Sequence, residues 1–514
     1  MSTVTGGPQI VRSGLVLALD ASSANSYGPI KAEVLVVAGG GGGGMDMGGG
    51  GGGGGVLYSS SYAITRGSSI TVTVGNGGTG APAAGTNGQP GGHQYTISAT
   101  QGGNSVFGSL TAIGGGFGGS SYFGYTPNYG YGGSGGSGGG ASGYSDTSTG
   151  RAGTGTSGQG FNGGGSSGQY YSGGGGGAGG AGVSGPNKPN GGPGVLYPTM
   201  SQYYFGGGGG GAAYSLSSGG DGGIGGGGGG AVGVTVGGAG LNNGSAGGGG
   251  SPGSQTNTPG GNAGANTGGG GGGGSHYNAN NKGGDGGSGI VIIRYKGPQK
   301  ATGGTVTTVG SETVHTFTSS GTFVTGTNFI DLSGNGNNGS LVNGVGYSGT
   351  NGGSLSFDGI NQRVSTNYKP SGERSYFIWV KFSSLTHSSG YQLTGTQETN
   401  SYTYIGIQNG GDVYYYAGAS TGGNIGNPVT VNTWVNLGFA LFPDGSRRVY
   451  KNGIEIHYNT GGLGGTATLE FSVGCINQNH FITGNISNVT IYNRALSASE
   501  IMQNFQATKS RFGL

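Results

Sequence analysis

Cysteine, proline and charge are all scarce in this sequence. The single cysteine, Cys475, excludes an internal disulfide framework and a metal site built on paired cysteines. Only 7% of the residues are charged and the formal net charge is +3, which argues against a nucleic-acid partner and against an anionic membrane surface. The longest apolar runs, VLVVA and IVII, are too short to cross a bilayer, so we expect no membrane insertion.

Signals for export and for catalysis are also missing. The opening residues, MSTVTGGPQIVR, contain no basic region followed by an apolar run, so they do not predict a secretion signal. Neither an H-E-x-x-H motif nor a Walker A motif is present, and the six histidines are scattered. The 16 acidic residues leave few candidates for a catalytic carboxylate pair. We therefore expect a protein that is not an enzyme.

Glycine is the residue that the sequence has in excess, with 142 of 514 positions. Collagen is excluded because there is no sustained Gly-X-Y period and only 15 prolines are present. Polyglycine cannot build a side-chain core, but its backbone donors and acceptors can join threefold helices packed side by side. The alternative is a flexible linker. The apolar strands AEVLVVAGG (32–40) and GGSGIVIIRYKG (286–297) bracket the glycine runs and favour ordered packing.

The C-terminal part, residues 327–514, has an ordinary globular composition and contains both tryptophans. Short alternating runs separated by turn signals predict an all-β domain, and PDGS and KNGI predict hairpin turns. Ser497 and Glu500 form a capping-box pattern that predicts a short helix. Strands are also expected within 68–78, as a short pair, and within 313–324.

Several motifs of this part resemble the concanavalin A-like, or laminin-G-like, superfamily. They are DLSGNGNNGSLVNG (331–344), FDGINQRV (357–364), the W…DGSRRVYKNG hairpin and IYNRALSASEI. The resemblance implies a jelly-roll sandwich in which a strand like GLVLALDA shortly precedes DLSGNGNNG. Here about 300 residues separate Tyr27 from Asp331. We therefore predict a jelly roll split in sequence: residues 1–30 hold the N-terminal tail and the first strand, 31–325 form an inserted glycine-rich domain, and 326–514 complete the sandwich. Segment 14–20 should pair near 486–492.

The glycine-rich region resembles domains of bacteriophage virion proteins, including tail-fibre-tip adhesins with packed polyglycine II helices. The resemblance rests on VLVVAGGGGGG, GGSGIVIIRY and VHTFTSSGTF. It implies a virion structural protein that is assembled in the host cytoplasm and released by lysis. The role that follows is a tail fibre or tail-tip adhesin that binds a host-surface glycan or protein. The alternative is an architectural capsid decoration, head-fibre or neck/tail appendage. The expected partners are other virion proteins, a host receptor and further copies of the chain.

Tyrosine-rich segments are the candidate receptor site, because sugars bind on aromatic faces flanked by amides and acids. Two strands, YTYIG and DVYYYAG, and one insert, YFGYTPNYGYGG, carry these residues. Strand alternation sends half of each strand set inward, so some of these tyrosines belong to the core. The insert is interpreted either as an exposed tip or as a cap on helix ends. The candidates are Tyr122, Phe123, Tyr125, Tyr129, Tyr131, Tyr402, Tyr404, Tyr414 and Tyr416.

A calcium site is the one cofactor site that the resemblance implies. Members of the superfamily bind Ca²⁺ through loop oxygens, and DLSGNGNNG supplies Asp331, Asn335 and Asn337, which Asp20 could join. Relatives often carry two acids where this chain has Ser487 and Asn488. The alternative interpretation of the loop is an Asx-rich turn without a metal.

Overall fold

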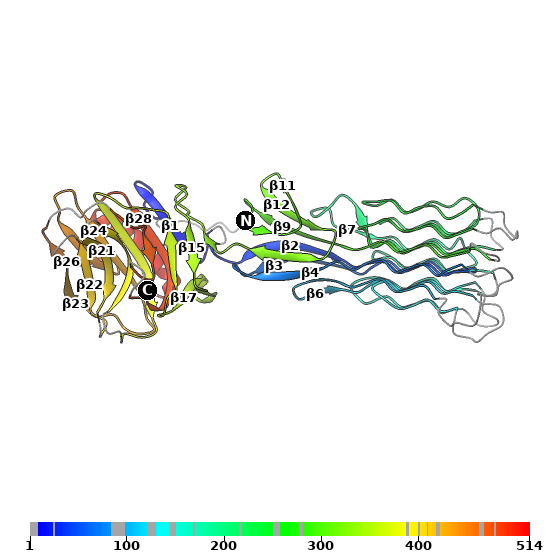
Figure 1. Ribbon diagram of the computed structural model, residues 1–514, viewed down its shortest axis with the longest axis horizontal. Coiled ribbons are helices and arrows are strands. Elements are labelled where there is room, and N and C mark those ends of the chain that lie inside the picture. The colour runs from blue at the N-terminus through cyan, green and yellow to red at the C-terminus, as the bar shows by residue number, and fades with distance from the viewer. Residues whose placement is uncertain are drawn as a thin grey trace. The chain divides into compact units, whose positions relative to one another are not determined.

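The chain forms two compact units in the computed structural model (Figure 1). Unit 1 holds residues 1–30, 65–67 and 326–514, and unit 2 holds residues 31–64 and 68–325. The structure describes residues 9–23, 26–83, 98–121, 130–143, 151–167, 170–214, 218–249, 258–276, 281–386, 390–398, 401–408, 410–417, 422–461, 467–476 and 480–514.

Unit 1 is a sandwich of two eight-stranded antiparallel sheets. The first sheet has the order β16 (Gly346–Ser348), β17 (Ser354–Asp358), β28 (Thr483–Tyr492), β19 (Arg374–Phe382), β24 (Trp434–Leu441), β25 (Arg447–Lys451) and β26 (Ile454–Asn459), and β1 (Leu15–Asp20) also pairs with β28. The second sheet has the order β14 (Asn328–Phe329), β15 (Gly339–Val342), β18 (Arg363–Thr366), β27 (Ser472–Val473), β20 (Tyr391–Glu398), β21 (Ser401–Ile407), β22 (Val413–Ala417) and β23 (Gly422–Gly426).

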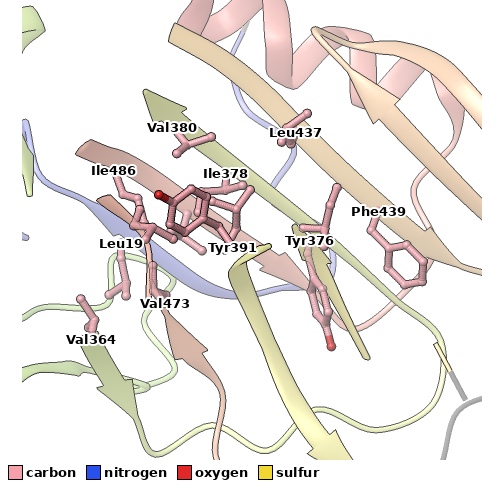
Figure 2. Packing of buried hydrophobic residues seen from close by; sticks show 14 of the residues in the cluster. Leu19, Val364, Tyr376, Ile378, Val380, Tyr391, Leu437, Phe439, Val473 and Ile486 are labelled. Carbon is pink, nitrogen blue, oxygen red and sulfur yellow. The ribbon is translucent and has the colours of Figure 1, made fainter. Parts of the chain in front are cut away.

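The hydrophobic core of unit 1 lies between these two sheets. Figure 2 shows side chains of both sheets meeting there: Leu19, Tyr376, Ile378, Val380, Leu437, Phe439 and Ile486 from the first sheet, and Val364, Tyr391 and Val473 from the second. All of them are buried. Alternation along each strand therefore leaves the intervening side chains on the outer faces of the sandwich.

Strand β1 belongs to this sandwich although most of the chain separates it from the other strands. It pairs antiparallel with β28, with Leu19 opposite Val489 and Asp20 opposite Asn488. Leu17 and Leu19 enter the core between the sheets. The predicted all-β jelly roll, split in sequence by an inserted glycine-rich domain, is confirmed.

The outer face of the first sheet is covered by the C-terminal helix α1 (Ala498–Thr508). Its N-terminus has the expected capping box, in which the Ser497 side chain accepts from the Glu500 N–H and the Glu500 side chain returns to the Ser497 N–H. Ile501 packs with Phe377 and Tyr492 of the sheet, and η1 (Thr350–Gly352) and η2 (Lys509–Phe512) are short 3₁₀ turns. Within the described ranges, no helix combines the length and apolar character that a bilayer crossing requires.

Unit 2 begins and ends in two antiparallel five-stranded sheets. One has the order β11 (Thr305–Val309), β12 (Glu312–Phe317), β9 (Ile290–Lys296), β2 (Ile30–Val37) and β3 (Val56–Ile64). The other has the order β10 (Ala301–Thr302), β13 (Gly321–Thr325), β4 (Ser69–Thr73), β5 (Ser105–Phe107) and β6 (Leu110–Ala112), and β7 (Val195–Leu196) pairs with β8 (Tyr204–Phe205). The bracketing strands β2 and β9 pair with each other. The segment 68–78 was expected to hold a strand pair but holds one strand, β4, because its partners β13 and β5 come from elsewhere.

The glycine runs form a bundle of extended segments that run side by side in unit 2 (Figure 1). The run 39–44 lies inside this bundle. Its N–H groups donate, in a repeat of three residues, to segments 100–103, 284–287 and 49–52, and its carbonyls accept in the same repeat from segments 115–118, 78–81 and 271–274, at 2.8–3.0 Å. A threefold helix with six neighbours is the packing expected for polyglycine II.

Interior positions of this bundle have no room for a side chain. A Cβ on Gly43 would clash with the carbonyl oxygen of Gly272, and the other residues of the run 39–44 meet neighbouring backbone in the same way. At the surface of the bundle every third residue can differ from glycine. In KGGDGGSG (282–289), Lys282 and Asp285 are exposed and the glycines between them are largely buried. Uninterrupted glycine therefore marks a helix surrounded on all sides.

A buried histidine makes the stability of unit 2 dependent on pH. His315 of β12 is fully buried, with Nδ1 2.8 Å from the Gly303 carbonyl and Nε2 2.9 Å from the Tyr295 hydroxyl. A carbonyl only accepts, so Nδ1 carries the proton and the neutral ring accepts from Tyr295 at Nε2. Burial lowers the pKa of His315 below its usual 6.5.

We predict that unit 2 loses stability as the pH falls below about 6.5, because the unfolded chain then binds a proton that the folded chain resists. The loss should continue down to the folded pKa of His315 and then stop. Calorimetric unfolding between about pH 7.5 and about pH 5 measures it. In His315→Gln the acid-dependent part should shrink, and an equal pH slope in both proteins would contradict the assignment.

Candidate functional site

Four tyrosines of the second sheet lie together on its outer face. Tyr402 and Tyr404 of β21 alternate with core-facing residues, and Tyr414 and Tyr416 of β22 flank Tyr415, which packs into the core. The register places Tyr404 opposite Tyr416. The expectation that alternation divides the tyrosines between core and surface is therefore met, with Tyr415 as the inward residue.

The four rings are in mutual contact. Tyr404 and Tyr416 stack with their centroids 5.8 Å apart and their planes 9° apart. Tyr402 meets Tyr416 edge-on at 6.3 Å, and Tyr414 lies 6.1 Å from Tyr404. We call these four residues the tyrosine cluster. Ring pairs of this kind hold one another in place, so the cluster is a fixed aromatic surface.

Glycine lies on either side of the stacked pair. Gly395 of β20 is opposite Tyr404, and Gly422 of β23 is opposite Tyr416. A Cβ on Gly395 would lie 2.5 Å from the Tyr404 Cβ, and a Cβ on Gly422 would lie 2.5 Å from the Tyr416 Cδ2. The two glycines thus leave space for the rings, and no side chain rises from the sheet at either of these two positions beside them.

Polar groups border the cluster. The Gln392 side chain lies beside Tyr404, and Asn424, opposite Tyr414, donates to Asp412 Oδ2 at 3.0 Å. Burial and the adjacent Tyr414 raise the pKa of Tyr404, and burial together with Tyr416 raises the pKa of Tyr414. Both hydroxyls are therefore neutral at physiological pH and can donate as well as accept hydrogen bonds.

The other predicted aromatic site is only partly described. Tyr131 is half-buried, and the Arg151 guanidinium lies 5.8 Å from its ring centroid. Tyr122, Phe123, Tyr125 and Tyr129 lie outside the described residues. An exposed aromatic tip at this insert stays a prediction.

The predicted calcium ligands Asp331, Asn335 and Asn337 come together against β1. Asp331 Oδ1 accepts from the N–H groups of Ala18 and Ser333 at 2.9 Å, and Oδ2 accepts from the Ser333 hydroxyl at 2.8 Å and the Asn337 N–H at 3.0 Å. The amides of Asn335 and Asn337 donate to carbonyls of β1. Both carboxylate oxygens of Asp331 thus already accept hydrogen bonds, mostly from backbone N–H groups. This favours the Asx-rich turn over a cation site.

Asp20, the fourth predicted ligand, lies beside the positively charged side chain of Arg511. Arg511 Nη1 donates to Asp20 Oδ1 at 2.9 Å, and Arg511 also donates to the Gly353 carbonyl and the Ser487 hydroxyl. The described residues contain no group of three or more histidine, cysteine or acidic side chains that could hold a metal ion. A second cation beside Arg511 would be repelled, so calcium at Asp20 stays a prediction that this geometry disfavours.

Sequence reasoning missed the residues that border the tyrosine cluster. Asp412 could have been found, because it stands two positions before Tyr414 and alternation puts both on one face. Gln392 and Gly395 of β20, and Gly422 and Asn424 of β23, reach the cluster through the register of the hairpins that these strands form with β21 and β22.

The family comparisons match both units of the chain. Residues 358–502 match the concanavalin A-like lectin/glucanases superfamily, and residues 21–265 match the glycine-rich domain family. The chain contains a concanavalin A-like domain and a glycine-rich domain. No curated protein matches the sequence.

Solved structures resemble a third of the chain. Domain 4 of an extracellular arabinanase from Geobacillus stearothermophilus is 19% identical, over 34% of this chain and 91% of that domain, with a TM-score of 0.30. The receptor-binding domain of botulinum neurotoxin type G is 15% identical, over 34% of this chain and 48% of that one, with a TM-score of 0.30. The sialidase of Trypanosoma rangeli is 15% identical, over 37% of this chain and 32% of that one, with a TM-score of 0.30. We rest no conclusion about function on these likenesses.

Proposed function

We propose that the concanavalin A-like domain binds a glycan on the tyrosine cluster. The observation that carries this proposal is the stacked pair Tyr404 and Tyr416, held on the outer face of the second sheet between two glycines. An aromatic surface of this kind offers apolar contact to the C–H face of a sugar ring. The amides of Gln392 and Asn424 and the carboxylate of Asp412 border it, as the few placed polar groups of a ligand site do.

Binding without catalysis is part of the proposal. Hydrolysis of a glycosidic bond usually needs two carboxyl groups on opposite sides of the bond. Asp412, the carboxylate beside the cluster, faces the amide of Asn424. We infer that it orients that amide toward a sugar hydroxyl.

We further propose that the protein is a bacteriophage tail fibre or tail-tip adhesin. The support is the resemblance of its glycine-rich edges to those of virion proteins, together with a glycine-rich domain whose helices are joined throughout by backbone hydrogen bonds. Such a domain suits a rigid extracellular part. Other virion proteins, a host-surface receptor and further copies of the chain are the partners in this proposal. A cryo-electron microscopy map that locates the chain at the distal end of a tail would support it. Density on capsid or neck would replace it with the architectural role.

Removing either stacked ring should weaken glycan binding. We expect Tyr416→Ala, which removes a half-buried ring, to weaken binding to the best ligand of a glycan array by about tenfold or more, since it loses an aromatic contact of about 1.5–3 kcal/mol. Tyr404 is only 9% exposed and stacks on Tyr416, so Tyr404→Ala should weaken binding by removing the ring that holds Tyr416 in place. Titration calorimetry on the full chain measures the loss. Tyr203→Ala removes an exposed tyrosine of unit 2 and should change nothing. Equal weakening in Tyr203→Ala, or unchanged binding in both cluster variants, would refute this site.

A further inference from the structure

One row of residues crosses seven strands of the second sheet and contains the stacked tyrosines. Each member is the register partner of the next. In order from β15 to β23 they are Ser340, Ser365, Ser472, Gly395, Tyr404, Tyr416 and Gly422. We call the first four the serine row.

The serine row faces outward. Leu341, Val364 and Val473 are sequence neighbours of its three serines, and all three belong to the core or pack against it. Alternation therefore turns the serines to the opposite face, which is also the face of the tyrosine cluster. Ser340 is exposed, and Ser365 and Ser472 are half-buried.

The serine row is a strip of small residues that ends beside the stacked rings of Tyr404 and Tyr416. Hydroxyl groups and one glycine are its only side-chain features, so it is lower than the large side chains around it and can donate and accept hydrogen bonds. The whole row spans six strand spacings of about 4.8 Å, or about 29 Å. That is the length of an extended chain of several sugar rings rather than of one.

The charges beside the row have both signs. Arg363 precedes Ser365 by two positions on β18, and Glu470 precedes Ser472 by two positions. A polyanionic glycan would meet repulsion at Glu470, and a polycationic one at Arg363. A neutral glycan is the ligand class that neither charge would repel.

We propose that the serine row binds an extended, linear, neutral polysaccharide whose chain runs across the strands and stacks on the Tyr404–Tyr416 pair. This inference rests on the proposed glycan function and names its ligand class. The row favours a glycan over a protein partner, because the centre of a protein interface is enriched in large aromatic, Met and Arg side chains, and the serine row has none.

The test compares ligand length in the full chain and in variants that fill the row. The probes are β-1,4-linked oligomers of glucose and of mannose, from dimer to octamer, in titration calorimetry. In the wild type, affinity should rise by about tenfold or more from dimer to hexamer. Ser365→Tyr should remove that gain and leave dimer binding unchanged, whereas Tyr404→Ala should weaken both lengths. Ser340→Tyr, at the exposed end of the row, repeats the test where a bulkier side chain does not disturb folding.

Ser319→Tyr is the matched control, because it makes the same change at an exposed serine of unit 2. Equal affinity for dimer and hexamer, with Tyr404→Ala still harmful, would overturn the serine row and leave the glycan function standing. Failure of every oligomer to bind would overturn the neutral-polysaccharide proposal, whereas failure of every ligand of the glycan array as well would overturn both proposals. Binding of a host protein that Ser365→Tyr blocks, without oligosaccharide binding, would replace the glycan with a protein partner.

Discussion

Gly43→Ala should destabilise the glycine-rich unit strongly. Gly43 lies inside the run 39–44, where its N–H donates to the Gly284 carbonyl and its own carbonyl accepts from Ala81, both at 2.9 Å. The added Cβ would clash with the carbonyl oxygen of Gly272. Because backbone cannot rotate away as a side chain can, two helices would have to separate. We expect a loss of about 3 kcal/mol or more, from the overpacking and from weakened hydrogen bonds.

Calorimetry and limited proteolysis would measure this loss. Both tryptophans of the chain, Trp379 and Trp434, lie in unit 1, so their fluorescence reports the unfolding of the sandwich and serves as an internal control. Gly249→Ala is the matched variant, since a Cβ there meets nothing within 4 Å. It should be neutral or slightly stabilising, because alanine restricts the unfolded chain. A Gly43→Ala protein as stable as Gly249→Ala would show that the helix bundle is not close-packed.

The local pattern of glycines contains more structural information than the overall glycine content of the chain suggests. The uninterrupted run 39–44 has neighbours on six sides, whereas KGGDGGSG repeats with a period of three and has exposed residues at that period. A local G-G-X period thus identifies a helix at the surface of the bundle. The identity of each helix's neighbours could not be predicted, because every glycine segment offers the same backbone groups to every other.

Sequence was most informative where a local rule acts alone. In the hairpin between β25 and β26, Asn452 and Gly453 adopt φ values of 53° and 79°, as the Asn-Gly pair predicts. The placement of β1 was also predictable, because the resemblance to the concanavalin A-like superfamily implies a strand like GLVLALDA shortly before DLSGNGNNG.

The register between strands set the limit at the candidate site. Two tyrosine strands could be predicted, but Gly395 and Gly422 come to lie beside the rings through pairings with β20 and β23. A bulge at Leu393 shifts the register of β20 by one residue. The serine row joins seven strands, and an error of one residue in any of them would turn that strand's side chains to the other face.

Asp331→Ala should destabilise the sandwich strongly. Asp331 lies just after the long insertion, and its side chain hydrogen-bonds to β1, which lies before the insertion. Asp331 is 7% exposed and accepts four hydrogen bonds, one of them from the Ala18 N–H of β1 at 2.9 Å. Alanine would leave the buried N–H of Ala18 and the N–H of Asn337 without their acceptor. At about 1–3 kcal/mol for each such group, we expect a loss of about 4 kcal/mol. Tryptophan fluorescence during urea unfolding measures it.

The same variant also distinguishes the two interpretations of the Asp331 loop, an Asx-rich turn and a calcium site. Asp358→Ala removes an exposed carboxylate that accepts from the Ile360 N–H at 2.9 Å, and it should cost less than about 1 kcal/mol. If the Asp331 loop is an Asx-rich turn, calcium and a chelator should leave the unfolding of the wild type unchanged. A calcium-dependent rise in stability that Asp331→Ala abolishes would instead assign the loop a metal, since a ligand stabilises the folded state that binds it. The four hydrogen bonds already made by Asp331 favour the first result, because a cation would have to displace them.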